Sequence, residues 1–253
     1  MATRPTLARV TPPPPEPADT AACEGDVVEA QRRGRLRDAQ LKAARLFEEV
    51  DERRIIRPGV SDKEASRVIR DLASELFGTT RHWHKRIVRS GEHTLLPYPE
   101  NPPDRVMTDD DIAFADFGPI FEGWEADFGR TWVLGDDPVK LRLRDDLAEV
   151  FAEGRRHFEE HPSVTGEQMY REVERLAIER GWSLGHVHCG HLVGRFPHRD
   201  FPGDYPSSHL MAGNSEPLRR AEPGGHVAHW ILEVHLVDRD RGFGGFYEEL
   251  LTV

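Results

Sequence analysis

Cysteine and long apolar runs are scarce in this 253-residue sequence. Its two cysteines are Cys23 and Cys189, and Cys23 lies in a proline-rich leader, so we expect no structural disulfide, as is usual in a reducing cytoplasm. No apolar run approaches the roughly 20 residues that span a bilayer. The first residues also lack the apolar core of a secretion signal. We therefore expect a cytoplasmic protein that does not cross a membrane.

Positive charge is also in deficit. Aspartate and glutamate number 45 against 34 lysines and arginines, which gives a net charge of -11. Nucleic acids and anionic membrane surfaces bind clustered positive charge. The balance therefore argues against either as a partner. It does not indicate what the partner is.

The proline-rich stretch "TPPPPEPADTAACEG" lies near the start of the chain. It lacks apolar periodicity, so we predict a disordered tail over residues 1–26. Residues 27–253 have an ordinary globular composition. We expect them to form a single domain.

Helix signals come first in that domain, and strand signals follow. Capping boxes at Ser61–Glu64 and Thr165–Gln168 mark two helix starts, and Pro138 marks another. The predicted helices are 27–52, about 61–77, 138–160 and about 165–181. The predicted strands lie in "RIVRSG", "DIAFADFG", "EADFGRTWVLG", "GHVHCGHLVG", "HVAHWILEVHLVD" and "GGFYEELLTV". This order predicts an α+β fold.

The stretch "FADFGPIFEGWEADFGRT" places an aspartate in each of two neighbouring strands. If the hairpin folds between Phe121 and Glu122, Asp116 faces Asp127 directly. Opposed positions have Cβ atoms about 4.5–5.5 Å apart. Two ionised carboxylates at that distance repel each other unless a cation lies between them. The pair therefore predicts a metal site of the two-ion hydrolytic kind.

A second hairpin carries two glutamates in the same way. If "WILEVHLVDRDRGFGGFYEELL" folds near Asp240–Arg241, Glu233 faces Glu248. Both have apolar neighbours, and a carboxylate inside a buried strand is unfavourable unless it is paired or bound to metal. The alternative is that all four carboxylates are exposed on one-sided sheets, because single acidic residues mostly are.

Four histidines lie in "GHVHCGHLVGRFPH", namely His186, His188, His191 and His198. An imidazole added to four carboxylates favours manganese, iron, cobalt or zinc. Taken singly, each of these histidines is more often structural or exposed.

Taken together, "DFGPIFEGWEADFGRT", "CGHLVGRFPH", "ILEVHL" and "FYEELLTV" resemble the metal-site motifs of the pita-bread metallopeptidases. That superfamily includes methionine aminopeptidase, aminopeptidase P, prolidase and creatinase. The resemblance covers about residues 27–253. It implies a pita-bread fold, in which helices cover a curved and mainly antiparallel sheet of a single catalytic domain.

The resemblance also implies a dinuclear site that holds two divalent ions (Mn, Fe, Co or Zn). Its five ligands would be Asp116, Asp127, His191, Glu233 and Glu248, with Asp127 and Glu248 as the bridging pair. Glu233 would also help to deprotonate a metal-bound water. His198 would bind the substrate carbonyl and stabilise the tetrahedral intermediate.

One position departs from the family pattern. Active members usually carry another histidine before the first aspartate, and the matching place here holds Pro97. His82, His84 and His93 are the nearby candidates to substitute for it. The stretch "RHWHKRIVRSGEHTLLPY" looks more like aminopeptidase P than like methionine aminopeptidase.

Three functions remain open at this point. The first is a metal-dependent hydrolase that resembles an Xaa-Pro or other aminopeptidase and cleaves a short peptide or an amide-like small molecule. The second is a non-peptidase acting on a small molecule on the same fold, which Pro97 motivates. The third is a non-enzymatic binding protein. A homodimer is among the assemblies that the resemblance implies.

Overall fold

The computed structural model describes residues 18–198, 206–222 and 224–253, and it contains four α-helices in that part of the chain. They are α1 (Ala18–Glu52), α2 (Asp62–Phe77), α3 (Pro138–Glu160) and α4 (Gly166–Glu179). Short 3₁₀ helices lie at Gly91–Leu95 and Pro206–Ser208. None of these helices is long and apolar enough to cross a bilayer.

The predicted helix starts are confirmed where capping chemistry sets them. Ser61 accepts a hydrogen bond from the backbone N–H of Glu64, and α2 follows. Thr165 and Gln168 form the reciprocal capping box of α4, and Pro138 opens α3. Each cap satisfies backbone donors that a helix start leaves without an intrahelical partner.

The first helix is longer than expected. We predicted its start at Val27, whereas α1 begins at Ala18. The predicted tail therefore overlaps this helix over residues 18–26, and residues 1–17 lie outside the described residues. The division of the chain into a tail and a domain stays a prediction.

The strands form one large sheet and one small hairpin. They are β1 (Ile87–Ser90), β2 (Ile112–Phe117), β3 (Ile120–Phe121), β4 (Trp124–Glu125), β5 (Phe128–Val133), β6 (Ser183–Leu184), β7 (His188–Val193), β8 (His209–Met211), β9 (His229–Asp238) and β10 (Phe243–Leu250). The large sheet has the order β1-β2-β5-β10-β9-β7-β8, with β6 also paired to β9. Every pairing is antiparallel, and β3 pairs with β4 alone. The predicted α+β class is confirmed.

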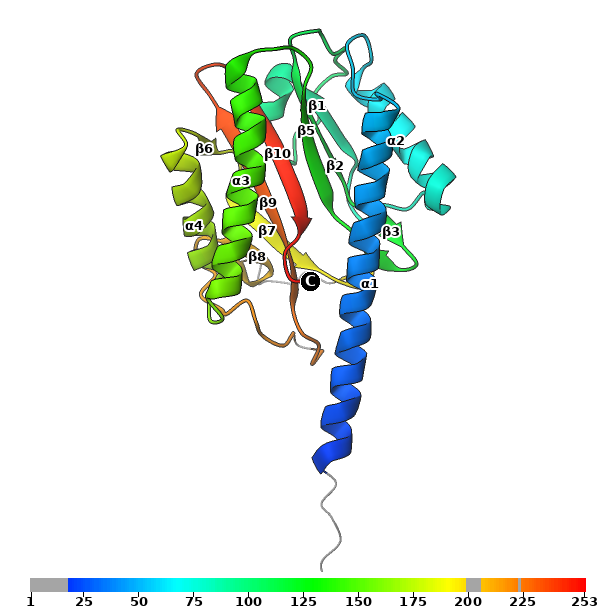
Figure 1. Cartoon of the computed structure of the whole chain (residues 1–253), viewed down its shortest axis with the longest axis vertical. Helices are drawn as coiled ribbons and strands as arrows, with labels where there is room; N and C mark the ends of the chain where they lie inside the picture. Colours follow the sequence, from blue (N-terminus) through cyan, green and yellow to red (C-terminus); the bar gives the residue numbers. More distant parts are fainter. Residues whose placement is uncertain (1–17, 199–205, 223) are drawn as a thin grey trace, which may run out of the picture.

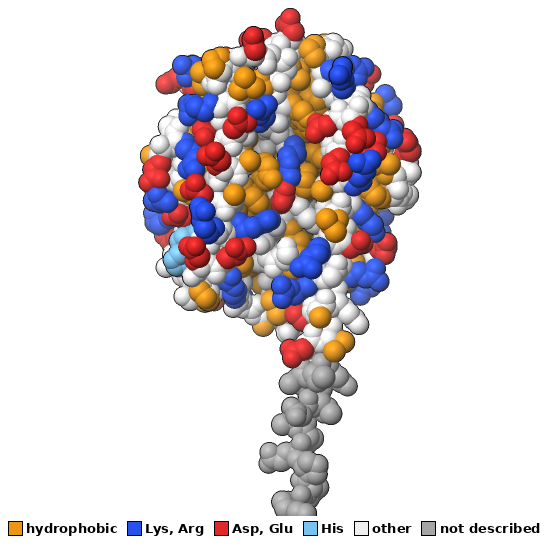
Figure 2. All heavy atoms as spheres, viewed as in Figure 1, with side chains coloured by type: hydrophobic (Ala, Val, Ile, Leu, Met, Phe, Trp, Pro, Cys, Tyr) orange, Lys and Arg blue, Asp and Glu red, His pale blue; other side chains and the backbone are white. Residues whose placement is uncertain are grey.

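Helices cover one face of this sheet. Figure 1 shows α1 and α3 lying across it, with β5 and β10 visible between them. On the helix-covered side, acidic and basic side chains are interspersed, without a large area of one sign (Figure 2).

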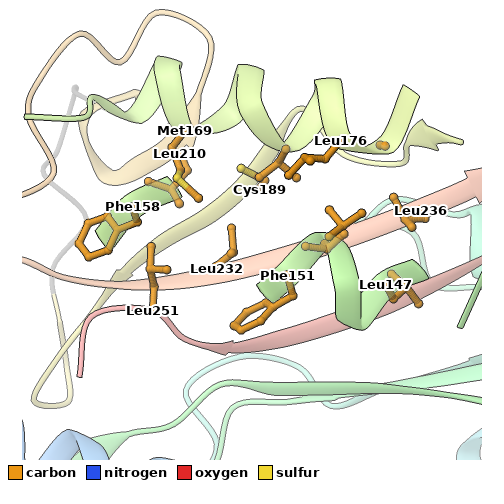
Figure 3. Close-up of a cluster of buried hydrophobic side chains, with 14 of the residues drawn as sticks. Leu147, Phe151, Phe158, Met169, Leu176, Cys189, Leu210, Leu232, Leu236 and Leu251 are labelled. Atoms are coloured by element: carbon orange, nitrogen blue, oxygen red, sulfur yellow. The ribbon is translucent and has the colours of Figure 1, made fainter. Parts of the chain in front are cut away.

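The alternation of side chains along β9 shows which face holds the core and which is left for a site. Leu232, Val234 and Leu236 pack with α3 and α4 in the main hydrophobic cluster. Cys189 of β7 is buried in the same cluster, beside Met169 and Leu176 of α4 (Figure 3). Because successive side chains of a strand point to opposite faces, Glu233 points away from the helices.

Candidate metal centre

Three of the expected ligands lie in one row across the sheet, on the face away from the helices. Asp116 of β2 is opposite Gly129 of β5. Gly129 is opposite Glu248 of β10, which is opposite Glu233 of β9. The predicted pairing of the two glutamates is therefore confirmed.

The predicted pairing of the two aspartates is wrong. Asp116 is opposite Gly129 instead of Asp127, so the observed register of the two strands differs from the expected one by two residues. The reason is the turn, which comprises Glu122 and Gly123, both with positive φ (52° and 84°), and connects the paired residues of β3 and β4. Two-residue hairpin turns of this kind favour glycine because it adopts positive φ without strain.

All four carboxylates are buried nevertheless, which the exposed-sheet alternative does not allow. The exposed fractions are 8% for Asp116, 2% for Asp127, 7% for Glu233 and 1% for Glu248. Among the described residues, the Oε2 atom of Glu248 has no hydrogen-bond partner. Buried like charges and an unpartnered carboxylate oxygen are unfavourable unless a cation balances them.

His191 enters this group from β7. Its Nε2 lies 3.2 Å from Oδ2 of Asp127 and 3.8 Å from Oε1 of Glu248. Its Nδ1 lies 2.8 Å from the carbonyl oxygen of Leu192. A backbone carbonyl only accepts, so Nδ1 carries a proton, and Nε2 is the ring atom that faces the carboxylates.

The carboxylates influence one another's ionisation strongly. Burial raises the pKa of Asp116 to about 7, and the nearby charge of Asp127 adds to this effect. Burial also raises the pKa of Asp127, but His84 and His191 outweigh it and hold that pKa well below its usual range. Burial, together with Asp127, raises the pKa of Glu248 well above its usual value. Carboxyl groups of one cluster whose pKa values are shifted in opposite directions are typical of functional sites.

Glu233 has histidine neighbours of its own. His188 lies against its carboxylate, and His186, His188 and Glu233 offer ligand atoms close enough to share one ion. Burial raises the pKa of Glu233, but His188 outweighs it, so that the pKa falls to about 2. Glu233 is therefore ionised at neutral pH.

His198 lies in the wall of the cavity above these groups. Its ring Nδ1 and its backbone N–H both contact the carboxylate of Glu125, which also accepts from the backbone N–H of Gly194. The cavity has a volume of about 770 Å³, and Trp83, Pro97 and Tyr98 are also in its wall.

A bound divalent metal is compatible with this centre. Five expected ligands, Asp116, Asp127, His191, Glu233 and Glu248, all line the same cavity. Hard carboxylates with at least one imidazole are a donor set for first-row divalent ions. The unpartnered oxygen of Glu248 leaves a ligand atom available to such an ion.

The sequence model of metallopeptidase family M24 matches residues 34–242. The chain belongs to this family. No curated protein sequence matches the chain.

Solved structures of M24-type peptidases share its fold. The Xaa-Pro dipeptidase from Bacillus anthracis has a TM-score of 0.69 at 23% identity, covering 89% of this chain and 63% of the other. A dipeptidase from Pyrococcus horikoshii OT3 has a TM-score of 0.69 at 19% identity, covering 85% and 55%. X-Pro aminopeptidase from Thermotoga maritima MSB8 has a TM-score of 0.67 at 20% identity, covering 90% and 64%. The predicted pita-bread fold is confirmed, and this chain spans between about half and two thirds of the length of these proteins.

The predicted set of ligands and catalytic residues omits Glu125 and His84, which line the same cavity. Glu125 contacts His198, and His84 contacts Asp127 and Asp116. Glu125 lies two residues before Asp127 and so points to the same side of an extended chain, a signal that the sequence carries. His84 is remote in sequence, and from the sequence it is only one of three histidines that could substitute for the one missing at Pro97. Pro97 lines the cavity but brings no polar side chain to it.

Proposed function

We propose that this M24 chain is a dinuclear metal-dependent hydrolase that cleaves a peptide or amide bond, in the manner of an Xaa-Pro or other aminopeptidase. The observation that carries the proposal is the set of four buried carboxylates and His191 at one cavity. The ligands would be Asp116, Asp127, His191, Glu233 and Glu248, and the ions two of manganese, iron, cobalt or zinc. When bound, such ions polarise a carbonyl and lower the pKa of a water molecule.

The residues of the chain supply proton transfer and orientation. His188 keeps Glu233 ionised at neutral pH, so its carboxylate would be available to accept a proton from an attacking water. Glu125 contacts Nδ1 of His198 and so orients the ring in the cavity wall, where this histidine would interact with a substrate carbonyl oxygen. Placing these two groups at one cavity would serve general base catalysis and stabilisation of the developing oxyanion.

The lining of the cavity offers no fixed cation to a substrate carboxylate. Among the described residues that line it there is no lysine or arginine. The bound ions would balance four of its carboxylates, so the absence of a basic side chain is the feature that bears on the substrate. It supports the aminopeptidase form of the proposal over a form that binds a free carboxylate next to the cleaved bond.

Pro97 favours a second candidate, a metal-dependent non-peptidase that acts on a small molecule. It lies in the cavity wall. The resemblance places it where active peptidases of the family usually carry a histidine. Proline can neither titrate nor donate a hydrogen bond there.

A turnover assay tests both candidates. The purified chain, loaded with manganese, cobalt or iron, is given Xaa-Pro dipeptides, other N-terminal peptides and non-peptide amides. We expect peptide turnover that Asp127→Asn abolishes and Asp110→Asn leaves unchanged, since Asp110 is an exposed partner of Lys140. Turnover of non-peptides alone would favour the second candidate. No turnover by metal-loaded protein would contradict both and favour a binding protein.

A further inference from the structure

The stretch "RHWHK" (81–85) brings a second imidazole to the proposed metal centre. Nε2 of His84 lies 3.0 Å from Oδ1 of Asp127 and 3.5 Å from Oδ1 of Asp116. The exposed fraction of its side chain is 7%. The ligand atoms of these three residues lie close enough together to hold one ion.

The position of His84 is fixed by its neighbour Trp83. The backbone N–H of Trp83 donates to the carbonyl oxygen of Gly118 over 3.0 Å. Its indole N–H donates to the carbonyl oxygen of Ala126, also over 3.0 Å. Both acceptors adjoin the hairpin that carries the two aspartates. A Cβ at Gly118 would lie 2.3 Å from Nε2 of His84 and Nε1 of Trp83, so only glycine admits this approach.

The ring of His84 is oriented by the same kind of hydrogen bond as the ring of His191. Nδ1 of His84 lies 2.7 Å from the carbonyl oxygen of Lys85, just as Nδ1 of His191 lies 2.8 Å from that of Leu192. A carbonyl oxygen only accepts, so Nδ1 carries a proton in both rings. In both rings Nε2 therefore faces Asp127, and loss of its proton on metal binding would leave the tautomer that a metal ligand needs.

We propose that His84 is a sixth metal ligand and that each of the two ions has its own imidazole. This inference rests on the proposed function. One position would be formed by His84, Asp116 and Oδ1 of Asp127. The other would be formed by His191, Glu248 and Oδ2 of Asp127. Asp127 would bridge them, because its two oxygens face the two imidazoles separately.

The preferred metal depends on this sixth ligand. A second imidazole makes the donor set softer, and imidazole suits iron, cobalt and zinc more than the carboxylate-preferring manganese. It also separates the role of His84 from that of the histidine missing at Pro97, since His84 would hold metal rather than substrate.

Cobalt titration of the metal-free protein tests the proposal, with cobalt absorption and bound cobalt as readouts. We expect wild type to bind two ions, and His84→Ala and His84→Gln to bind one of them at least about tenfold more weakly. His82→Ala is the matched control, since His82 flanks Trp83 on the other side and lies outside the cavity lining. Added imidazole should restore part of the affinity of His84→Ala, which a misfolded variant would not show.

Two results would overturn the inference in different ways. Wild-type affinity for both ions in His84→Ala, with impaired turnover, would assign His84 to the substrate and leave the hydrolase proposal intact. Wild type that takes up no cobalt would contradict the inference and the proposed function together. X-ray absorption of the zinc-loaded protein gives an independent count, because His84→Ala should lose one of the imidazoles seen in wild type.

Discussion

Glu125 lies at the centre of a small hydrogen-bonded group. Its exposed fraction is 2%, and it accepts from the backbone N–H groups of Gly194 and His198 and from Nδ1 of His198. A carboxylate that holds a histidine in this way fixes the orientation and tautomer of the ring. We infer that Glu125 positions His198 and does not itself contact the substrate.

Glu125→Gln should lower kcat by roughly a hundredfold, because the amide is neutral and holds the ring less well. KM and the metal content should stay close to wild type. Glu122→Gln is a matched control, since Glu122 is exposed on the turn and pairs with Arg35 and Lys42. Loss of metal from Glu125→Gln would show that Glu125 acts on the ligands instead.

The protonation of the ligands predicts how metal affinity depends on pH. Burial lowers the pKa of His84, but Asp127 and Asp116 outweigh it and raise that pKa to about 9. The pKa of Asp116 is raised to about 7 by burial. Both groups therefore hold protons near neutral pH in the metal-free protein, and a metal must displace them.

Apparent cobalt affinity should accordingly rise with pH between about pH 6 and pH 9. The sign follows because the metal-free state binds more protons than the metal-bound state, so a low proton concentration favours binding. Calorimetry in two buffers of different protonation enthalpy measures the protons released. His84→Ala should release fewer. Affinity that is independent of pH would argue against protonated ligands.

At the scale of strands, Gly129 is what allows the row of carboxylates to form. It separates Asp116 from Glu248 in the register of the sheet. A Cβ there would lie 2.5 Å from Cδ1 of Phe246 and 3.1 Å from the Cβ of Glu248. Any larger residue would displace Phe246, or the strand that carries Glu248.

Gly129→Ala should therefore lower the free energy of unfolding by about 1–3 kcal/mol, since overpacking strains a close-packed sheet. It should also weaken metal binding. Thermal melts and cobalt titration measure the two effects. Gly34→Ala is the control, because a Cβ at this position in α1 has no neighbour within 4 Å and alanine favours a helix. A Gly129→Ala variant as stable as wild type would contradict the argument.

Local rules in the sequence predicted the four helices, most of the large sheet's strands and one of the two hairpins, but they did not predict β6 or β8. Capping residues placed the starts of α2, α3 and α4, and the charged loop near Asp240 gave the correct register of Glu233 and Glu248. The register of the aspartates failed because the fold was placed one residue early, before Glu122 instead of after it. A shift of two residues kept both aspartates on one side, so the site survived the error.

Tertiary contacts were beyond the reach of such rules. His84 reaches Asp127 because Trp83 hydrogen-bonds to residues 118 and 126, and no periodicity in the sequence records that contact. The partnership of Glu125 with His198 likewise depends on how the segment after β7 passes β4. Local patterns fix elements, whereas the packing of distant segments decides which side chains meet.

At the scale of the whole molecule, the two faces of the sheet have different roles. Its helix-covered face buries the apolar clusters, and its other face carries the cavity with the metal-site residues. Since metal ions are the cations that would balance the buried carboxylates, the number bound per chain reports directly on the proposed site. The expected homodimer and cytoplasmic location stay predictions.

The most direct test of the account is the metal content of the purified protein by elemental mass spectrometry, for wild type and Asp127→Ala in parallel. We predict about two divalent ions per chain in wild type, and fewer than one in the variant because Asp127 would bridge both. Wild type that is metal-free and takes up no manganese, iron, cobalt or zinc would contradict the account.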